Sequence, residues 1–192
     1  MAKFPAFVNG SYVSQSPLAD QERTINWYVE PIEGAGASTD AALYPTPGVE
    51  TVVDVGAGTG VGRAHIYADL REFAIVGPTL WEITEAGGTT SRGTVSVDGN
   101  PATFSYNGDG GGQLFITSGT NGYCYDLGTN TLTQVVNLNG KATMGDMIDG
   151  YFLCLDSSTS TVYISDLLDG LTWDPTQFFQ RNQAPDAWVS MK

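Results

Sequence analysis

Histidine and cysteine are nearly absent from this sequence of 192 residues, which holds one histidine, His65, and two cysteines, Cys124 and Cys154. A single imidazole cannot build a multi-histidine metal site or a pH switch of clustered histidines. Two cysteines make no disulfide framework, and each stands in an apolar run, where a thiol behaves as a small hydrophobic group. We therefore expect both to be core residues; a disulfide or a reactive thiol is the alternative.

Basic side chains are also scarce: eight Lys and Arg stand against 21 Asp and Glu, a formal net charge of −13. Nucleic-acid surfaces and anionic membranes are bound through Lys and Arg, so the composition disfavours both partners. No apolar run approaches the roughly 18 residues of a membrane helix, and residues 1–5 lack the pattern of a signal peptide. We expect a chain that is made as a soluble cytosolic product.

Glycine and aromatic residues, in contrast, are plentiful. The chain has 24 Gly, 9 Pro and 41% hydrophobic residues, 11% of the total being aromatic. This is too apolar for disorder, and so much glycine is typical of a fold dense in turns. Because no 11-residue window keeps a helical apolar stripe, we expect one sizeable domain of many short strands.

The first 60 residues predict an extended leader. Short strand signals at residues 11–13 and 24–29 are separated by polar punctuation, and the glycine-rich residues 34–39 read as a flexible excursion. Residues 43–48 (LYPTPG) contain two prolines, which forbid helix and favour an extended entry followed by a turn. We expect domain boundaries at 1–60 for this leader and 61–192 for the domain after it.

From residue 61 a pattern repeats about every 40 residues. Each unit holds a hairpin of an apolar strand, a turn and an aromatic-bearing strand, at residues 73–83, 114–126 and 151–164. A further strand precedes each hairpin, and in the first two units another follows it. The preceding strands are expected at residues 65–67, 103–106 and 142–148, and the following ones at 94–97 and 131–136. Four short strands every 40 residues or so predict an all-β, β-propeller-like fold with about three blades.

Three blades cannot close a ring, because propellers have at least four. Residues 187–192 also read as a strand, which would leave an unpaired edge. We therefore expect an incomplete ring, cut before closure, completed either by a longer protein or by other chains. The recurring aromatics Trp81, Tyr123 and Tyr163 are interpreted as inter-blade core; stacking platforms for sugars or bases are the alternative.

Three motifs have an enzymatic or metal-binding interpretation. Residues 52–60 (VVDVGAGTG) resemble the first motif of class I S-adenosylmethionine-dependent methyltransferases, but no helical pattern follows, which favours a glycine-rich connection into the first blade. Residues 107–112 (NGDGGG) suggest a calcium loop but lack its later glutamate, so we favour a long hairpin connection. Residues 169–173 (DGLTW) resemble the Asp-box of sialidase-type propellers, with a spacing one residue too short.

No nucleophile and base are paired in the sequence, and no pair of carboxylates is singled out among 14 Asp and 7 Glu. We therefore assign no catalytic, cofactor-binding or metal residues, expect no cofactor, and expect a protein that is not an enzyme.

Several short motifs together resemble a known family. They are residues 25–30 (INWYVE), 43–49 (LYPTPGV), Gly62-Arg63, 80–83 (LWEI), 162–167 (VYISDL) with 173–175 (WDP), and 183–186 (QAPD). The chain is similar in these places to the packaged-DNA stabilisation proteins of short-tailed bacteriophages, also called tail accessory or plug proteins. Members of that family are considerably longer, so the chain resembles roughly their first two fifths.

This resemblance implies a structural protein of the virion, assembled in the cytoplasm of the host bacterium. Such proteins form a hexameric ring between the portal with its adaptor ring and the tail needle, and they hold packaged DNA inside until ejection. No catalytic residue is carried over. The alternative function is a carbohydrate-binding or glycan-processing β-propeller of a phage tail, and a methyltransferase is the third.

Acidic residues concentrate in the blades. Residues 93–180 contain one basic residue, Lys141, and nine aspartates: 98, 109, 126, 146, 149, 156, 166, 169 and 174. An acidic wall facing a channel would repel DNA and let it slide, whereas a basic wall would retain it. The alternative is that these aspartates stand in turns and solvate the surface.

Overall fold

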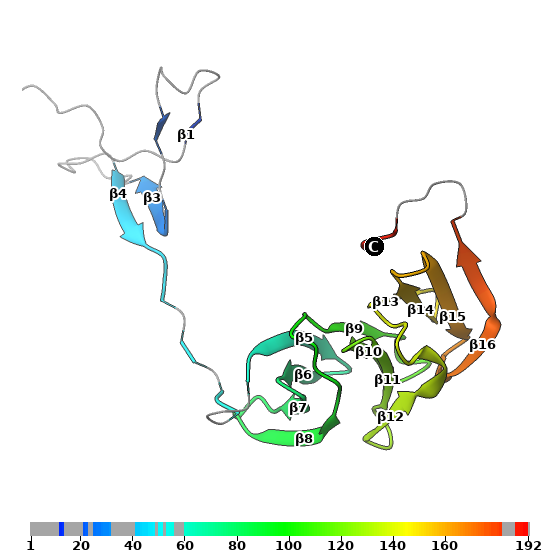
Figure 1. Ribbon diagram of the computed structural model, residues 1–192. Helices are drawn as coiled ribbons and strands as arrows, with labels where there is room; N and C mark the ends of the chain where they lie inside the picture. Colours follow the sequence, from blue (N-terminus) through cyan, green and yellow to red (C-terminus); the bar gives the residue numbers. More distant parts are fainter. Residues whose placement is uncertain are drawn as a thin grey trace, which may run out of the picture. The chain divides into compact units, whose positions relative to one another are not determined.

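The computed structural model describes residues 12–13, 21–22, 25–31, 41–48, 50–51, 53–55, 60–181 and 187–191 (Figure 1). These residues form strands, turns and one short 3-10 helix, η1 (Val136–Leu138). The chain divides into two compact units, Met1–Thr51 and Val52–Lys192, and each is described here by itself.

The first unit contains two small antiparallel ribbons. Strand β1 (Tyr12–Val13) pairs with β2 (Gln21–Glu22), and β3 (Trp27–Pro31) pairs with β4 (Ala41–Pro45). The rings of Tyr28 and Tyr44 stack across the second ribbon with centroids 5.8 Å apart. Asn26 has a positive φ of 58°, so the strand predicted at 24–29 begins only after it. The excursion expected at residues 34–39 lies outside the described residues.

The second unit contains three four-stranded antiparallel sheets, as the repeat predicts. Strands follow one another in chain order within each sheet, and the sheets follow one another along the chain (Figure 1). Sheet 1 is β5 (Gly62–Ala68), β6 (Arg71–Val76), β7 (Thr79–Ile83) and β8 (Thr89–Thr94); sheet 2 is β9 (Thr103–Tyr106), β10 (Gln113–Ser118), β11 (Asn121–Asp126) and β12 (Thr131–Val135); sheet 3 is β13 (Met144–Ile148), β14 (Tyr151–Asp156), β15 (Thr161–Asp166) and β16 (Asp169–Gln180).

The seam between sheets 1 and 2 is an apolar core made by alternate residues of facing strands. Phe73, Ile75 and Leu80 from sheet 1 are fully buried against Leu114, Ile116 and Tyr125 of sheet 2. The rings of Phe73 and Tyr125 meet edge to face at 5.4 Å. Because alternate side chains of a strand point to opposite sides, this core uses only one surface of each sheet.

A second seam joins sheets 2 and 3. Phe115 lies at its centre, 5.0 Å from the Trp173 ring and 5.4 Å from the Phe152 ring. Cys124 and Cys154 are buried in the same cluster and carry free thiols, which confirms their interpretation as core residues. Burial, with a smaller effect of Asp169 and Asp126, raises the pKa of the Cys124 thiol to about 12, so it stays protonated and unreactive near neutral pH.

The fourth strand of the first blade is displaced from its predicted position. It was expected at residues 94–97, but β8 spans Thr89–Thr94. The preceding turn explains the difference, because the Thr84 N–H donates to the Gly88 carbonyl, the Gly87 N–H donates to the Thr84 carbonyl, and the Thr84 hydroxyl accepts the Gly88 N–H at 2.9 Å. This turn starts the strand immediately at Thr89, and the apolar Val95 then leaves the sheet to enter the seam.

Two further differences lie near the C-terminus. Strand β16 was not predicted, because its polar sequence with Pro175 lacks alternation; it pairs along β15 as an edge strand with register shifts, where proline is tolerated. Residues 187–191, expected to be a strand, form none. The centroid of the Trp188 ring instead lies 5.8 Å from that of the Phe179 ring, and the backbone N–H of Trp188 donates to the Ser160 hydroxyl.

One buried arginine closes an end of the first seam. The Arg63 side chain is 7% exposed, and its guanidinium supplies five N–H donors in a fixed plane. It donates to the Asn100, Ser96 and Gly77 carbonyls, the Ser118 hydroxyl and the Asp98 carboxylate at 2.8–3.3 Å. Arg63 therefore ties the start of β5 to turns of both sheets.

A second arginine closes the other end of this seam. Arg71 donates twice to the Glu82 carboxylate, at 2.7 and 2.8 Å, and Arg92 donates to Glu82 at 2.6 Å. Arg71 also reaches into sheet 2, where it donates to the Leu127 carbonyl and to the Asn130 side chain. The hydrogen bond from Arg71, followed by the one from Arg92, lowers the pKa of the Glu82 carboxyl despite its burial.

Replacing Arg63 by methionine should lower the free energy of unfolding by about 3 kcal/mol, because the change leaves several buried acceptors without a donor. Lysine should restore little of this, since an ammonium group cannot reach acceptors spread around a plane. Urea unfolding of both variants measures the effect. Arg181, which is exposed, is the control, and its replacement by alanine should change stability by less than about 0.5 kcal/mol.

Glu82 should contribute a pH-dependent part of the stability. Its folded pKa lies below its ordinary value of 4.5, so its contribution is complete above that value and is lost as the pH falls through the lowered folded pKa. Unfolding free energies measured at pH 7 and in steps down to pH 3 should fall less steeply for Glu82→Gln than for the unchanged protein. Equal slopes would contradict this assignment.

Candidate functional site

The connections of the three sheets gather at two opposite ends of the second unit. Antiparallel order puts the turns between first and second strands, and between third and fourth strands, at one end; all other connections lie at the opposite end. Contacts between sheets agree with this. Arg71 bonds the turn after β11, while the Ala142 N–H donates to the Thr120 carbonyl at the opposite end.

Carboxylates collect at the first of these ends, which we call the acidic end. It is defined by Asp69, Glu85, Asp109, Asp126, Asp149, Asp166 and Asp169, all in or beside its turns. Arg71, the first residue of β6, lies beside these turns and shares the Glu82 carboxylate with Arg92. Lys141 and the buried Arg63 both belong to the opposite end. The charge of the blades is therefore distributed unequally between their two ends.

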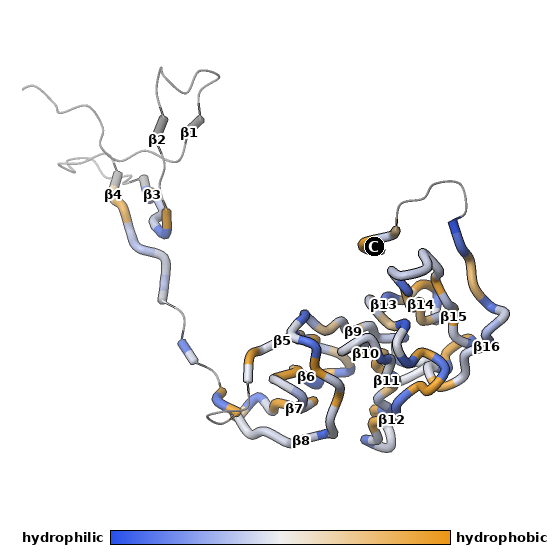
Figure 2. The backbone as a smooth tube through the Cα atoms, in the orientation of Figure 1, coloured by the Kyte–Doolittle hydropathy of each residue, from blue (hydrophilic) through white to orange (hydrophobic). Residues whose placement is uncertain are grey.

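Large apolar side chains are exposed among these carboxylates. Leu70 is 87% exposed in the turn after β5, and Leu167 and Leu171 are about half exposed in and after the turn between β15 and β16. Figure 2 shows the hydrophobic and hydrophilic residues alternating at short intervals along the three sheets. The acidic end therefore carries individual exposed leucines beside its carboxylates.

Carboxylates of the acidic end also affect the neighbouring side chain of Tyr106. The Tyr106 hydroxyl donates to the Asp109 carboxylate at 3.0 Å. Burial raises the pKa of Tyr106 to about 12, and the negative charges of Asp109 and Asp69 add to this effect. Tyr106 therefore stays protonated near neutral pH and remains a hydrogen-bond donor to Asp109.

Most of the nine blade aspartates have a structural task. Six accept a backbone N–H close in sequence, which holds a turn or a strand end: Asp98, Asp126, Asp146, Asp156, Asp169 and Asp174. This supports the turn interpretation of these residues. One of the nine, Asp146, lies in the first strand of a sheet, β13. The first strands of the three sheets are neighbours, because β9 contacts both β5 and β13.

The methyltransferase-like segment gains no support. Val52 and residues 56–59 lie outside the described residues, and residues 53–55 form no strand. After Gly60 the chain enters strand β5 rather than a helix. A helix N-terminus is what such a motif needs to hold a cofactor, so this segment is a connection into the first sheet.

The other motifs of the sequence also have structural positions. Residues 107–112 connect β9 to β10, as we expected, and Asn107 bonds Gln113 across the base of this loop. The Asp-box-like segment 169–173 starts β16, where the Trp173 indole donates to the Gly170 carbonyl at 2.8 Å. His65 is exposed and pairs with Glu72 at 2.9 Å.

No group of three or more His, Cys, Asp or Glu that could hold a metal ion occurs among the described residues. The same part of the chain has no helix that is long and apolar enough to cross a membrane.

The recurring aromatics lie in or beside the seams. Tyr123 is 5% exposed between sheets 1 and 2, and Tyr163 packs beside the core between sheets 2 and 3. Trp81 is half-buried on the side of sheet 1 that faces away from sheet 2. For Tyr123 and Tyr163 the inter-blade interpretation is confirmed.

Sequence reasoning missed the residues that give the acidic end its apolar part. Leu70 and Leu167 stand in turns, and Leu171 lies near the start of β16. For Leu70 and Leu167 the signal was available as leucine beside aspartate at turn positions, where polar residues are usual.

The chain matches one known protein family over nearly its whole length. The sequence profile described as "Bacteriophage P22 Gp10, beta-propeller" matches residues 8–192. That description agrees with the three four-stranded sheets found here. No curated protein is significantly similar to the chain.

Two solved structures share a distant likeness. The N-terminal domain of Nup159 is 11% identical, with a TM-score of 0.46 over 62% of this chain and 31% of that structure. The Neurospora crassa Pan2 WD40 domain is also 11% identical, with a TM-score of 0.42 over 62% of this chain and 36% of that structure. The chain thus spans about a third of each, and neither bears on function.

The two kinds of aspartate should differ in their effect on stability. Asp156 is 4% exposed and accepts the N–H and the hydroxyl of Ser158, so Asp156→Ala should cost about 1–2 kcal/mol of unfolding free energy. Asp166 has no such side-chain bond among the described residues, and Asp166→Ala should change it by less than about 0.5 kcal/mol. Thermal or urea unfolding of this pair tests the distinction, which equal losses would refute.

Proposed function

The chain belongs to the phage structural family described as Bacteriophage P22 Gp10, beta-propeller, and from this we propose that it is a tail component that closes the portal channel and stabilises packaged DNA. In this role it stands as a hexameric ring between the portal with its adaptor ring and the tail needle, within the virion. The family match, which extends over both units of the chain, is the observation that carries the proposal.

The physical character of the blades supports a closure role. Seams between sheets are filled with fully buried side chains, and the first seam is closed at both ends by arginine networks. Such packing gives a rigid body suited to resisting pressure from packaged DNA. The acidic end repels phosphates, so DNA passing nearby would not adhere.

A glycan-binding or glycan-processing tail propeller is the competing function. It needs exposed aromatic platforms or two converging carboxylates. Tyr123 and Tyr163 are instead used in the seams, and six blade aspartates hold backbone turns. These observations favour the closure role, and a glycan array with a hydrolysis assay should give no signal for this chain.

Phage particles assembled without this protein should package DNA and then lose it, because nothing closes the channel. The measurement is the fraction of particle DNA that resists added nuclease after packaging. The unchanged protein and the exposed-site variant Arg181→Ala, supplied in trans, should restore resistance, and Arg63→Met should restore less because its first seam is weakened. Full resistance in particles that lack the protein would overturn the proposal.

A further inference from the structure

Three Asn–Gly steps occur in the described part of the chain: Asn107-Gly108, Asn121-Gly122 and Asn139-Gly140. A fourth, at residues 9–10, lies outside the described residues. An asparagine before glycine can modify itself, because glycine has no Cβ to hinder its backbone nitrogen from approaching the asparagine side chain. The three steps share this chemistry, so their folded surroundings decide which of them reacts.

The first two steps are held by packing. Asn107 is 5% exposed, and its Oδ1 accepts the Gln113 N–H at 2.8 Å. Gly122 is buried inside β11, between β10 and β12. A Cβ at Gly122 would lie 2.9 Å from the Leu138 Cδ1, so this backbone is closely packed. Reaction at Asn107 or Asn121 would first have to break these contacts by local unfolding.

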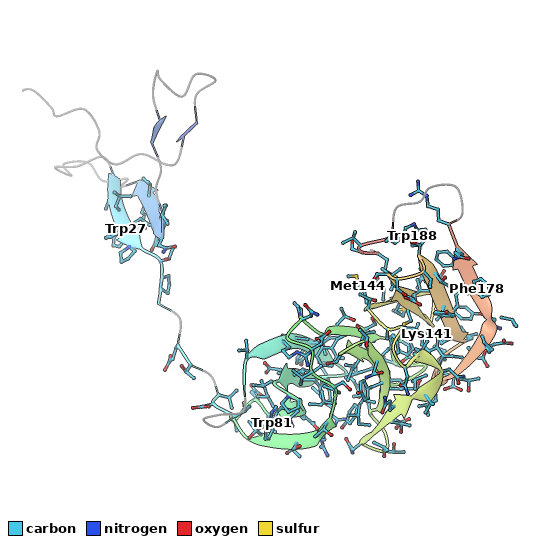
Figure 3. All side chains as sticks on the ribbon, in the orientation of Figure 1. Trp27, Trp81, Lys141, Met144, Phe178 and Trp188 are labelled. Carbon is cyan, nitrogen blue, oxygen red and sulfur yellow. The ribbon has the colours of Figure 1, made fainter. Side chains whose placement is uncertain are left out.

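The third step is open. Asn139 and Gly140 are both exposed, directly after η1 in the connection from sheet 2 to sheet 3. A Cβ at Gly140 would meet no atom of the described residues within 4 Å. Lys141, labelled in Figure 3, follows this step. The Gly140 N–H donates to the Asn121 Oδ1 at 3.2 Å, the long end of the usual range, so the glycine nitrogen is weakly restrained.

The carboxamide of Asn139 is also activated. The Gln134 Nε2 donates to the Asn139 Oδ1 at 2.8 Å. Attack on a carboxamide carbon places negative charge on its oxygen, and a donor already aimed at that oxygen stabilises the charge. Of the three asparagines, Asn139 thus combines an accessible glycine nitrogen with a donor at the atom where charge develops.

We propose that Asn139 is a site of spontaneous deamidation and isomerisation. The Gly140 nitrogen attacks the Asn139 Cγ and gives up its proton; the carboxamide C–N bond breaks, ammonia leaves with that proton, and a five-membered succinimide remains. Water then breaks one of the two ring C–N bonds and leaves either aspartate or isoaspartate at this position. No oxidant or reductant takes part. This modification goes beyond the proposed function and does not depend on it.

Isoaspartate at this position should weaken the connection between sheets 2 and 3. It routes the backbone through the former side chain, which adds a methylene to the main chain. Close to this point, the Lys141 N–H donates to the Leu138 carbonyl and the Ala142 N–H donates to the Thr120 carbonyl. Leu138 and Ala142 are buried in the second seam, so a longer backbone here disturbs their packing. Aspartate keeps the original backbone and adds only an exposed charge.

Peptide mapping by mass spectrometry, after incubation of the chain at mildly alkaline pH, tests the site. The peptide with Asn139 should convert at least about tenfold faster than those with Asn107 and Asn121, because only the latter need local unfolding first. In guanidinium chloride the three rates should come close together. Similar rates in the folded chain, or the same large difference in the unfolded chain, would overturn the inference.

Variants test the role of the donor. Gln134 is exposed in β12, so Gln134→Leu should fold, which circular dichroism checks. Without the donor, conversion at Asn139 should slow at least about threefold. The matched control is Thr133→Leu at the neighbouring exposed position, which should leave the rate unchanged. Equal rates in the two variants would refute the activation by Gln134.

Urea unfolding tests the consequence. Freshly prepared Asn139→Asp should unfold at the same urea concentration as the unchanged chain, because its backbone is intact. An aged sample rich in isoaspartate at this position should unfold at a lower concentration. Equal midpoints for the aged and fresh chains would refute the effect on the connection.

Discussion

Each four-stranded sheet of this protein buries its apolar side chains only by packing against the next sheet. The strands alternate, so Phe73 and Ile75 can enter one seam and leave the opposite side of sheet 1 to a different neighbour. The arginine networks at the two ends of the first seam depend on the same packing, since Arg63 and Arg71 both join groups from sheet 1 to groups from sheet 2. Stability, rigidity and the ability to add further sheets all follow from this constraint.

The turns explain much of the acidic charge of the blades. Backbone N–H groups in the turns need a hydrogen-bond acceptor. The short carboxylate side chain of aspartate provides that acceptor in several turns. Asp126 and Asp169 show the pattern at equivalent ends of sheets 2 and 3. The resulting negative charge belongs to the turns. Because many of these acids lie at one end of the sheets, that end has a negative electrostatic potential, and exposed leucines stand beside the acids there.

The proposed closure role depends on family membership and on the packing of the blades. Fully buried side chains fill both seams, and arginine networks close both ends of the first one. Resistance to pressure would therefore come from contacts between sheets, whereas the acidic charge comes from the turns at their ends.

Local alternation and turn residues, which can be read along the chain, were enough to predict the blade repeat, the number of sheets, most hairpins and the core position of both cysteines. The family resemblance was likewise visible in short motifs of the sequence. Strand β8 and strand β16 were misplaced or missed, because a hydrogen-bonded turn at Thr84 and edge pairing along β15 decide them, not their own composition. The folded structure was needed to show that acids of all three sheets share one end, that Arg63 and Arg71 each join sheet 1 to sheet 2, and that the Trp81 indole has no hydrogen bond among the described residues. These facts arise where residues distant in sequence meet, and no local pattern records such meetings.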